Sequence, residues 1–566
     1  MSGVTTRRLH CTGPRSAAAA MLAAALALGC ARAPVRPGAD AAGGREAAVN
    51  GVVELRLAVP AGAPVRAEVL APSGARIHVP AFPVPGGWAA RFRPREPGRH
   101  RWVARSGEGA AAAEVARGEV MAEDRGLAGQ VIVSGGTLRT EDGRPFRPLG
   151  ENRFNVYDPT WSDGLSPADY VARMAADGMN ALRVFVFTAC GRAGTMPNPG
   201  CLEPVLGAFD EAAAARYDAI FAAAEAHGVK VVLSVFAIGF TPGDAWKGWE
   251  ENPYSAARGG PAAGNTDFFL DPRAREAARA RLRYVLARWG ASPALLAIDL
   301  LNEPEWDGAI PEDHWIPWAE DLARTWRAED PYGHPVTAGP VGLHWNVEED
   351  ERAWWASAAC DIVQWHRYGP DVHDVHDLAE ALVETTRDTA RYGKPVLIGE
   401  FGWGGDAKPE HDHTHVGIWA ATFAGAGVLS HSAPPFTEDS DEPMTPARAR
   451  HFRTLAAFLR RAEARGPLAP APEPAVRRAP GLRALALGGE RAAAVWLLAP
   501  RPGYGGRVKG ARLTLAGIAP GRWRVTWVED VSGEVIAVEE RDASGPLPLD
   551  VPPFARHVAA LVERIE

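Results

Sequence analysis

The chain has 566 residues, which at about 150 residues per domain allows three or four domains or one large domain with appendages. Its contents of 46% hydrophobic and 23% charged residues are ordinary for globular proteins and exclude a wholly disordered or fibrous chain. The formal net charge of −8 excludes the basic footprint of a nucleic-acid-binding protein. The unusual count is that of Trp, because 19 Trp outnumber 18 Phe.

The first thirty residues predict a targeting segment. Arg7 and Arg8 precede an apolar run over residues 17–28, which is too short for a stable membrane anchor and is typical of a signal peptide. Cys30 ends this run after a small residue, a pattern typical of bacterial lipoproteins. We therefore expect a lipoprotein-type signal peptide over residues 1–30, lipidation at Cys30, and an extracytoplasmic protein that is lipid-anchored to a bacterial membrane. Simple secretion is the alternative.

Residues 31–49 are rich in Ala, Gly, Pro and Arg and predict a flexible tether. Residues 50–125 and 482–566 carry short alternating apolar and polar runs separated by Pro and Gly turns, a pattern typical of β-sandwiches. We expect an immunoglobulin-like sandwich in the first range and a second sandwich in the last. Residues 466–481 are rich in Pro and Ala and predict a linker.

Residues 126–465 have a different pattern, in which apolar strand-like runs alternate with amphipathic helical segments. Alternation of buried strands and helices favours a parallel sheet, and eight units over this length fit a (β/α)8 barrel. A doubly wound open sheet is the alternative, and the lack of a Gly-rich phosphate loop after the first strand weighs against it. The eight predicted strands lie near residues 147–150, 181–185, 229–236, 295–301, 334–341, 361–368, 394–401 and 425–432.

The cysteines also fit an exported protein. Cys190 and Cys201 bracket a loop rich in Gly and Pro, and they predict a disulfide in an oxidising compartment. Two unpaired thiols are the alternative. Cys360 is left without an expected disulfide partner, and we expect it to be buried near the start of a strand.

Two predicted strands of the barrel end in a carboxylate. The fourth runs into Asn302-Glu303-Pro304 and the seventh into Glu400-Phe401-Gly402. The carboxyl ends of barrel strands build the active site, and the fourth and seventh strands lie on opposite sides of its mouth. Glycoside hydrolysis needs two carboxylates that flank the scissile bond. The pattern therefore predicts Glu303 and Glu400 as a catalytic pair.

These motifs resemble the glycoside hydrolases of clan A, especially the family 5 cellulases and mannanases. The resemblance covers most of residues 146–440 and includes Asn180-Ala181-Leu182-Arg183 and His366-Arg367-Tyr368. It implies that Glu303 is the acid/base and Glu400 the nucleophile of a retaining enzyme. The further roles that it implies are contact with the sugar 2-OH by Asn302, ionisation of Glu400 by Arg183, positioning of Glu400 by Tyr368, and lining of the catalytic centre by His366.

The sequence departs from this family in two places. The end of the third strand lacks the usual His, and the eighth strand has His431 where a Trp usually forms the floor of the −1 subsite. Flat indole rings stack on sugars, so aromatic side chains after barrel strands predict sugar platforms. Trp315 and Trp318 lie three residues apart on a predicted helix, so for one of them packing in the protein core is at least as good an interpretation as sugar binding. The substrate-binding residues that we expect are Trp161, Trp246, Trp306, Trp403 and His431.

His411, His413 and His415 follow the seventh strand, together with Asp406 and Glu410. This group could bind a metal, but a solvated loop is the favoured interpretation, and no metal or other cofactor is expected.

The function expected is hydrolysis of a β-linked glucan or mannan by a monomeric glycosidase. The partners expected are therefore a β-linked oligo- or polysaccharide and, through Cys30, a membrane. A non-catalytic, surface-anchored carbohydrate-binding protein and a transglycosylase of a cell-surface polysaccharide are the alternatives.

Overall fold

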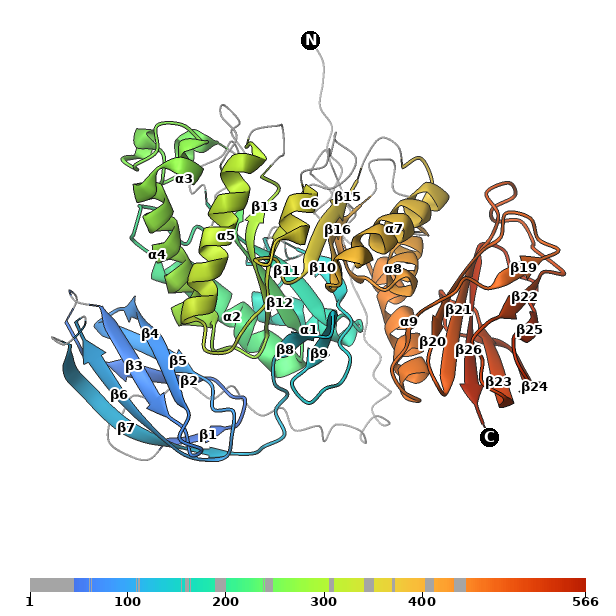
Figure 1. Cartoon of the computed structure of the whole chain (residues 1–566), viewed down its shortest axis with the longest axis horizontal. Helices are drawn as coiled ribbons and strands as arrows, with labels where there is room; N and C mark the ends of the chain where they lie inside the picture. Colours follow the sequence, from blue (N-terminus) through green and yellow to red (C-terminus); the bar gives the residue numbers. More distant parts are fainter. Residues whose placement is uncertain are drawn as a thin grey trace, which may run out of the picture. The chain divides into compact units, whose positions relative to one another are not determined.

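The computed structural model shows a parallel β-barrel with β-sheets before and after it in the chain (Figure 1). The described residues belong to one compact unit. They are residues 45–60, 62, 64–107, 109, 112–153, 155–157, 162, 164–188, 200–237, 239, 248–304, 310–340, 351–368, 372–402, 412–431 and 444–565.

The barrel is an eight-stranded sheet in the order β14-β13-β12-β11-β10-β17-β16-β15, and the pairs within it are parallel. The ends of this sheet meet where the Asp361 N–H donates to the Val336 carbonyl at 2.8 Å. The predicted (β/α)8 barrel is therefore confirmed. Its strands are β10 (Leu149–Asn152), β11 (Ala181–Phe187), β12 (Lys230–Ala237), β13 (Leu295–Asn302), β14 (Val336–Gly339), β15 (Val363–Arg367), β16 (Val396–Phe401) and β17 (Gly427–His431).

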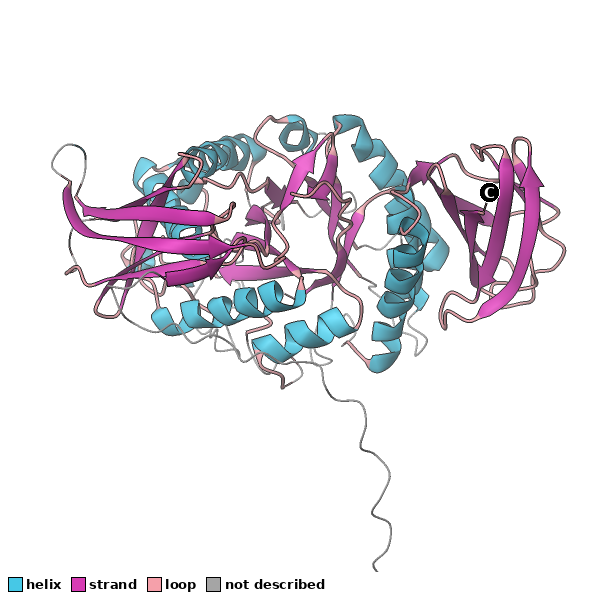
Figure 2. Ribbon diagram, turned by 90° about the horizontal axis from the view of Figure 1, so that it is seen from below, coloured by secondary structure: helices cyan, strands magenta, loops and turns pink. Residues whose placement is uncertain are grey.

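Helices surround the strands (Figure 2). Two of the helices begin with the same local signal, because Ser166 and Thr445 cap their first turns and a Pro follows each cap. The α-helices are α1 (Pro167–Ala176), α2 (Glu211–His227), α3 (Asp267–Leu270), α4 (Pro272–Trp289), α5 (Glu312–Glu329), α6 (Glu351–Ala356), α7 (Val375–Thr389), α8 (Asp412–Ala424) and α9 (Pro446–Glu463). Short 3₁₀ helices are η2 (Trp249–Glu251), η3 (Ala256–Arg258) and η5 (Ala390–Tyr392).

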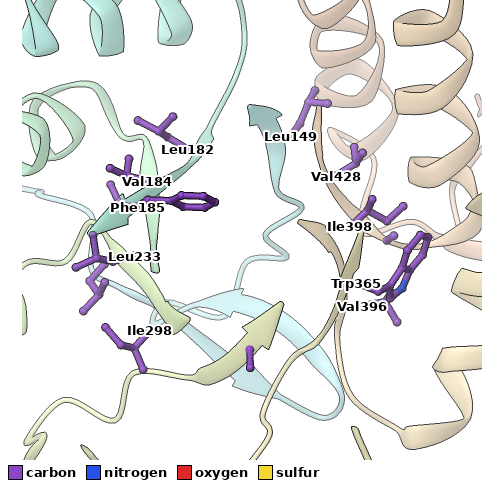
Figure 3. Close-up of a cluster of buried hydrophobic side chains, with 14 of the residues drawn as sticks. Leu149, Leu182, Val184, Phe185, Leu233, Ile298, Trp365, Val396, Ile398 and Val428 are labelled. Atoms are coloured by element: carbon purple, nitrogen blue, oxygen red, sulfur yellow. The ribbon is translucent and has the colours of Figure 1, made fainter. Parts of the chain in front are cut away.

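The main core lies between the strands and the helices. Successive strand residues face opposite sides of a sheet, so Leu182 and Val184 point away from the side to which Arg183 points. Figure 3 shows part of this core on several strands of the ring, including Ile298 and Val428. Trp315 and Trp318 are also buried in it, so both pack in the core.

A small hairpin covers the end of the barrel at which the strands begin. Strands β8 (Val131–Ser134) and β9 (Thr137–Thr140) pair antiparallel, and their buried residues Val131 and Leu138 pack against residues near the start of the barrel strands. Ala181, Val232 and Leu397 belong to the same cluster. The hairpin therefore keeps water from this end of the barrel and leaves the carboxyl ends of the strands as the reactive mouth.

The N-terminal sheet has seven strands in the order β1-β7-β6-β3-β4-β5-β2. Strand β4 pairs with β3 along its first half and with β5 along its second half, so the sheet folds over its own core. The end of the predicted tether forms β1, which pairs parallel with β7. These strands are β1 (Arg45–Ala48), β2 (Val53–Leu57), β3 (Val65–Leu70), β4 (Arg76–Val84), β5 (Gly87–Phe92), β6 (Gly98–Ser106) and β7 (Ala113–Glu123).

The C-terminal region has a six-stranded sheet, β18-β20-β21-β26-β23-β24, and a three-stranded sheet, β19-β22-β25, which share one core. The prediction of a linker over residues 466–481 was wrong, because β18 and β19 lie there and pair with β20 and β22. Pro and Ala are compatible with short edge strands. These strands are β18 (Ala469–Ala471), β19 (Ala475–Arg477), β20 (Arg483–Gly488), β21 (Ala492–Leu498), β22 (Arg512–Leu515), β23 (Gly521–Val528), β24 (Val535–Ala543), β25 (Leu547–Asp550) and β26 (His557–Arg564).

A buried carboxylate joins the C-terminal sheet to the barrel. Asp530 accepts a hydrogen bond from Trp496 at 2.8 Å and lies 2.6 Å from His557 Nδ1 and 3.1 Å from His415 Nε2. Burial alone would raise the pKa of Asp530, but the neighbouring imidazoles hold it well below its usual value. Burial disfavours the charged form of His557, whereas the negative charge of Asp530 favours it. The net result is a raised pKa for His557.

This contact corrects the predicted solvated loop of histidines. His413 and His415 lie in α8 and are buried, and His415 also approaches Nδ1 of His451 at 3.0 Å. The loop prediction was wrong because the partners of His415 come from the far end of the chain. His411, Asp406 and Glu410 lie outside the described residues.

Among the described residues, no helix is long and apolar enough to cross a membrane.

The Asp530 contact predicts a large, pH-dependent effect on stability. Asp530→Asn leaves buried His557 without its anionic partner and should cost about 3–5 kcal/mol of unfolding free energy. Because the pKa of His557 is raised, its contribution to the unfolding free energy is fully present below its ordinary pKa of 6.5. This contribution is lost as the pH rises through the pKa of His557 in the folded state. Asp530, with its lowered pKa, stabilises above its ordinary value of 3.8. The loss should therefore be largest between these two values.

Denaturant unfolding at pH 5–6 and at pH 9 measures this difference. Asp542→Asn is the matched control, because Asp542 is exposed on β24 of the same sheet, and it should change the free energy by less than about 0.5 kcal/mol. Equal effects of the two substitutions at pH 5–6 would contradict the account.

Candidate active site

Glu303 and Glu400 lie together at the carboxyl ends of the fourth and seventh barrel strands. Glu303 directly follows β13, and Glu400 is in β16. They are 9% and 5% exposed, and single carboxylate oxygens of the two lie within 4.8 Å of each other and of a His366 nitrogen. The fold thus brings the two predicted carboxylates together, largely shielded from water.

The backbone of Glu303 has a conformation that L-residues rarely adopt. Its φ is +46°, and its N–H donates to the Gly339 carbonyl at 2.8 Å. A non-glycine residue in this region costs about 1–3 kcal/mol and persists where its surroundings fix it, often at functional sites. A functional role of the Glu303 side chain would account for this strain.

Arg183 connects the site across the barrel. Its Nε and Nη2 donate to Asp299 Oδ2 at 2.9 and 2.7 Å, and its Nη1 donates to Glu400 Oε1 at 2.5 Å. The side chains of Arg183 and Asp299 are fully buried. A buried guanidinium needs anionic partners, and here two carboxylates on different strands share it.

Glu400 is held at both carboxylate oxygens. The Tyr368 hydroxyl donates to Oε2 at 2.8 Å, and His431 Nδ1 lies 3.5 Å from the same oxygen. Burial alone would raise the pKa of Glu400, but the nearby positive charges of His366 and Arg183 hold it well below its usual value. Glu400 is therefore ionised at neutral pH.

Glu303 has a different environment. His366 Nδ1 lies 2.6 Å from Glu303 Oε1 and 3.8 Å from Glu400 Oε1, so this ring stands between the two carboxylates. Asn302 accepts from Arg183 Nη2 at 2.6 Å and donates to Glu303 Oε2 at 3.3 Å. The short contact between Glu303 and His366 holds a proton that the two groups can share.

Two glycines make room for this packing. A Cβ at position 339 would lie 2.2 Å from Gln364 Nε2 and 2.9 Å from His366 Nε2. A Cβ at position 399 would also lie 2.9 Å from His366 Nε2. A larger residue at Gly339 would force Gln364 to move, and one at either position would press on the His366 ring.

The donor atoms here form a hydrogen-bonded acid/base set instead of an ion cage. His366 and Glu303 already contact each other at 2.6 Å, which is closer than two ligands of one metal ion approach each other. The Arg183 guanidinium supplies the positive charge that pairs with the Glu400 carboxylate. The same reasoning holds for His557 and Asp530, whose atoms also lie 2.6 Å apart.

The structure describes only some of the predicted site residues. It brings Glu303, Glu400, Arg183, Asn302, His366, Tyr368 and His431 together. Cys201 is disulfide-bonded and Cys360 is a buried free thiol. The predicted residues that lie outside the described ranges are Cys30, Trp161, Cys190, Trp246, Trp306 and Trp403.

Sequence reasoning missed Asp299 and Asn152. Asp299 is the one charged residue in the apolar run over 295–301 and lies four residues before Glu303, a signal that could have been used. Asn152 accepts from Arg183 Nη1 at 3.1 Å. It escaped notice because the first strand was placed over 147–150, whereas β10 extends to Asn152.

Comparisons with known proteins agree with this geometry. Residues 140–430, about half of the chain, match the model of the family described as "Cellulase (glycosyl hydrolase family 5)". The chain is similar to "Probable mannan endo-1,4-beta-mannosidase F" of Aspergillus flavus, with 26% identity over 47% of this chain and 60% of that relative. It is also similar to "Mannan endo-1,4-beta-mannosidase 2" of Oryza sativa subsp. japonica, with 26% identity over 46% of this chain and 64% of that relative. The match thus spans less than two thirds of the length of these curated relatives.

Solved structures share the fold. A crystal structure from Bacteroides vulgatus aligns with a TM-score of 0.60 and 16% identity over 92% of this chain and 100% of its own. A glycoside hydrolase family 5 structure from the same species aligns with a TM-score of 0.52 and 17% identity, over 77% of this chain and 94% of its own. With a family model that matches half of its length over the barrel that carries Glu303 and Glu400, the chain belongs to glycosyl hydrolase family 5.

Proposed function

We propose that the protein is a retaining glycosidase that cleaves a β-linked mannan or glucan, with Glu400 as the nucleophile and Glu303 as the acid/base. The observation that carries this proposal is the pair of carboxylates within 4.8 Å in different environments. Retaining enzymes place their carboxyl groups about 5–5.5 Å apart, whereas inverting enzymes leave about 6.5–9.5 Å for a water molecule.

In the first step, ionised Glu400 attacks the anomeric carbon, and a proton from Glu303 passes to the leaving oxygen. Arg183 and Tyr368 keep the Glu400 carboxylate in place and ionised. The 2.6 Å contact between Glu303 Oε1 and His366 Nδ1 holds the proton that this step uses.

In the second step, water hydrolyses the glycosyl ester. Once Glu400 is esterified, its charge no longer opposes ionisation of Glu303, which can then accept a proton from the attacking water. The reaction ends with the anomeric configuration retained and both carboxylates restored. A non-catalytic binding protein would have no need of this shared proton or of a strained Glu303.

Mannan is the substrate that we propose first, because the curated relatives reported above are named as mannan endo-1,4-β-mannosidases. Family membership alone supports the broader class of β-linked glucans and mannans. Asn302 is proposed to contact the sugar 2-OH, and Trp161, Trp246, Trp306 and Trp403 remain proposed sugar platforms.

We further propose that the protein is exported and anchored to a bacterial membrane through a lipid on Cys30. The support for this proposal is the sequence of residues 1–30, in which paired arginines, an apolar run and a small residue precede the cysteine. Such an anchor would hold the barrel at a surface where extracellular polysaccharide is available.

Glu303→Gln and Glu400→Gln should each lower kcat on an activated β-glycoside by about 10³-fold or more, because each removes a group that acts in the transition state. Unchanged thermal unfolding would show that the fold is intact. Glu380→Gln, at an exposed position on α7, is the control and should keep full activity. Near-normal turnover in either site variant would refute the assignment.

Purified protein assayed on defined β-mannans, β-glucans and xylans should release products fastest from a β-mannan. Chromatography of the products reports their length and also detects any transfer to a sugar acceptor. Faster hydrolysis of a β-glucan would reject the mannan preference but keep the glycosidase, whereas binding of all three polymers without cleavage would favour the binding protein.

Cys30→Ser should move the protein from the membrane fraction to the soluble fraction of a bacterial host that processes lipoproteins. Cys11→Ser, within the segment expected to be removed, is the control and should remain in the membrane fraction. Radioactive palmitate should label the parent chain and Cys11→Ser but not Cys30→Ser. Labelling that persists in Cys30→Ser would exclude this anchor.

A further inference from the structure

His431 occupies the end of the eighth barrel strand, beside the proposed nucleophile. It is the last residue of β17 and pairs in register with Asn152 of β10. Its side chain is 14% exposed, and Nδ1 lies 3.5 Å from Glu400 Oε2. The edge of one ring meets the face of the other in the Tyr368–His431 pair, whose centroids are 6.0 Å apart. A titratable ring therefore contacts the carboxylate that the reaction uses.

The orientation of the Asn152 amide is fixed by Arg183. A guanidinium has donors and no acceptor, so the atom of Asn152 that meets Arg183 Nη1 at 3.1 Å must be the carbonyl oxygen Oδ1. The amide nitrogen of Asn152 then faces His431, and it lies 2.9 Å from Nδ1 of the ring. This assignment follows from hydrogen-bonding capacity alone.

The protonation of His431 follows in turn. An amide nitrogen donates and cannot accept, so His431 Nδ1 must offer its lone pair to Asn152. The ring is then neutral and carries its proton on Nε2. A proton on Nδ1 would break the bond to Asn152, and the new N–H would have Glu400 Oε2 as its acceptor.

Charged groups on several strands face this ring. The negative charge of Glu400 on β16 favours a proton on Nδ1. The positive charge of Arg183 on β11 opposes it, and Arg183 also orients Asn152 so that its amide nitrogen donates to Nδ1. From α9, Arg448 Nη2 donates to the backbone carbonyl of His431 at 2.6 Å. His366 on β15 lies on the other side of Glu400. His431 is thus poised between an amide donor that keeps Nδ1 unprotonated and a carboxylate that attracts a proton.

We propose that His431 is a positioning residue that switches the nucleophile off in acid. In the active state, Nδ1 accepts from Asn152 and leaves Glu400 Oε2 to Tyr368. In acid, Nδ1 takes a proton from solvent, loses Asn152 and donates to Glu400 Oε2. The added charge lowers the nucleophilicity of Glu400 and pulls its carboxylate from the position that Tyr368 sets.

This inference rests on the proposed function, and it places the acid limb of kcat/KM in the range where imidazole titrates, about pH 5–8. A carboxylate nucleophile held by Arg183 would by itself lose activity only at much lower pH. The acid limb would thus report His431 and not Glu400.

Two variants shift this limb in opposite directions. In His431→Asn, the side-chain carbonyl can accept from Asn152 in place of Nδ1 but cannot titrate, so the acid limb should move down by about one pH unit or more. In Asn152→Asp, a carboxylate accepts from a protonated Nδ1, so the limb should move up by a similar amount. The readout is the position of the limb and not the maximal rate. His78→Asn is the control, because His78 is 71% exposed and lies on the N-terminal sheet, and its limb should not move.

The tautomer can be measured without any enzymatic assay. Nitrogen-15 NMR of histidine-labelled wild-type protein at pH 7.5 should show one ring with unprotonated Nδ1 and protonated Nε2 that is missing in His431→Asn. That ring should become doubly protonated over the same pH range as the acid limb. This readout tests the switch even if no glycoside is cleaved.

The outcomes separate the two proposals. Retaining hydrolysis with an acid limb that stays in place in both variants would overturn the switch and leave the glycosidase intact. A His431 ring protonated at Nδ1 at pH 7.5 would also overturn it. The expected tautomer in a chain that cleaves no glycoside would support the hydrogen-bond assignment but refute the proposed function.

Discussion

The site depends on one buried guanidinium that two carboxylates share. Arg183 holds Asp299 through two nitrogens and Glu400 through a third, and the same side chain fixes the amides of Asn302 and Asn152. A buried carboxylate without such a partner would take up a proton. Four strands of the barrel are thus tied to one charge, which helps to lower the pKa of Glu400 and, through Asn152, sets the tautomer of His431.

The rest of the chain keeps this arrangement rigid. The hairpin of β8 and β9 covers the far end of the barrel with Val131 and Leu138, which shields the interior charges from water at that end. Asp530 ties the C-terminal sheet to α8, the helix that follows the strand of Glu400. The N-terminal sheet is fastened similarly, because Arg91 donates to Asp218 of α2 at 2.8 Å. The β-sheets therefore brace the helices whose strands carry the site.

Much of this was predictable from sequence, since strands that end in a carboxylate are a local signal. The barrel, its order of strands and the meeting of Glu303 with Glu400 needed only the alternation of apolar runs and the rule that strand ends share one mouth. The contacts of His415 were not predictable, because its partner Asp530 lies 115 residues away. The strands at 469–477 were missed because Pro and Ala signal a linker unless their pairing partners are known. Asn152 was missed because a boundary error of two residues hid the polar end of a strand.

The central claim is that Glu400 attacks the sugar while Glu303 does not. An activated 2-deoxy-2-fluoro glycoside forms the glycosyl ester but hydrolyses slowly, so peptide mass spectrometry can locate the sugar. The account predicts one label per chain on the peptide that contains Glu400, and no label on that peptide in Glu400→Gln. A label on Glu303, or turnover of β-glycosides to α-configured products without any labelled peptide, would contradict it.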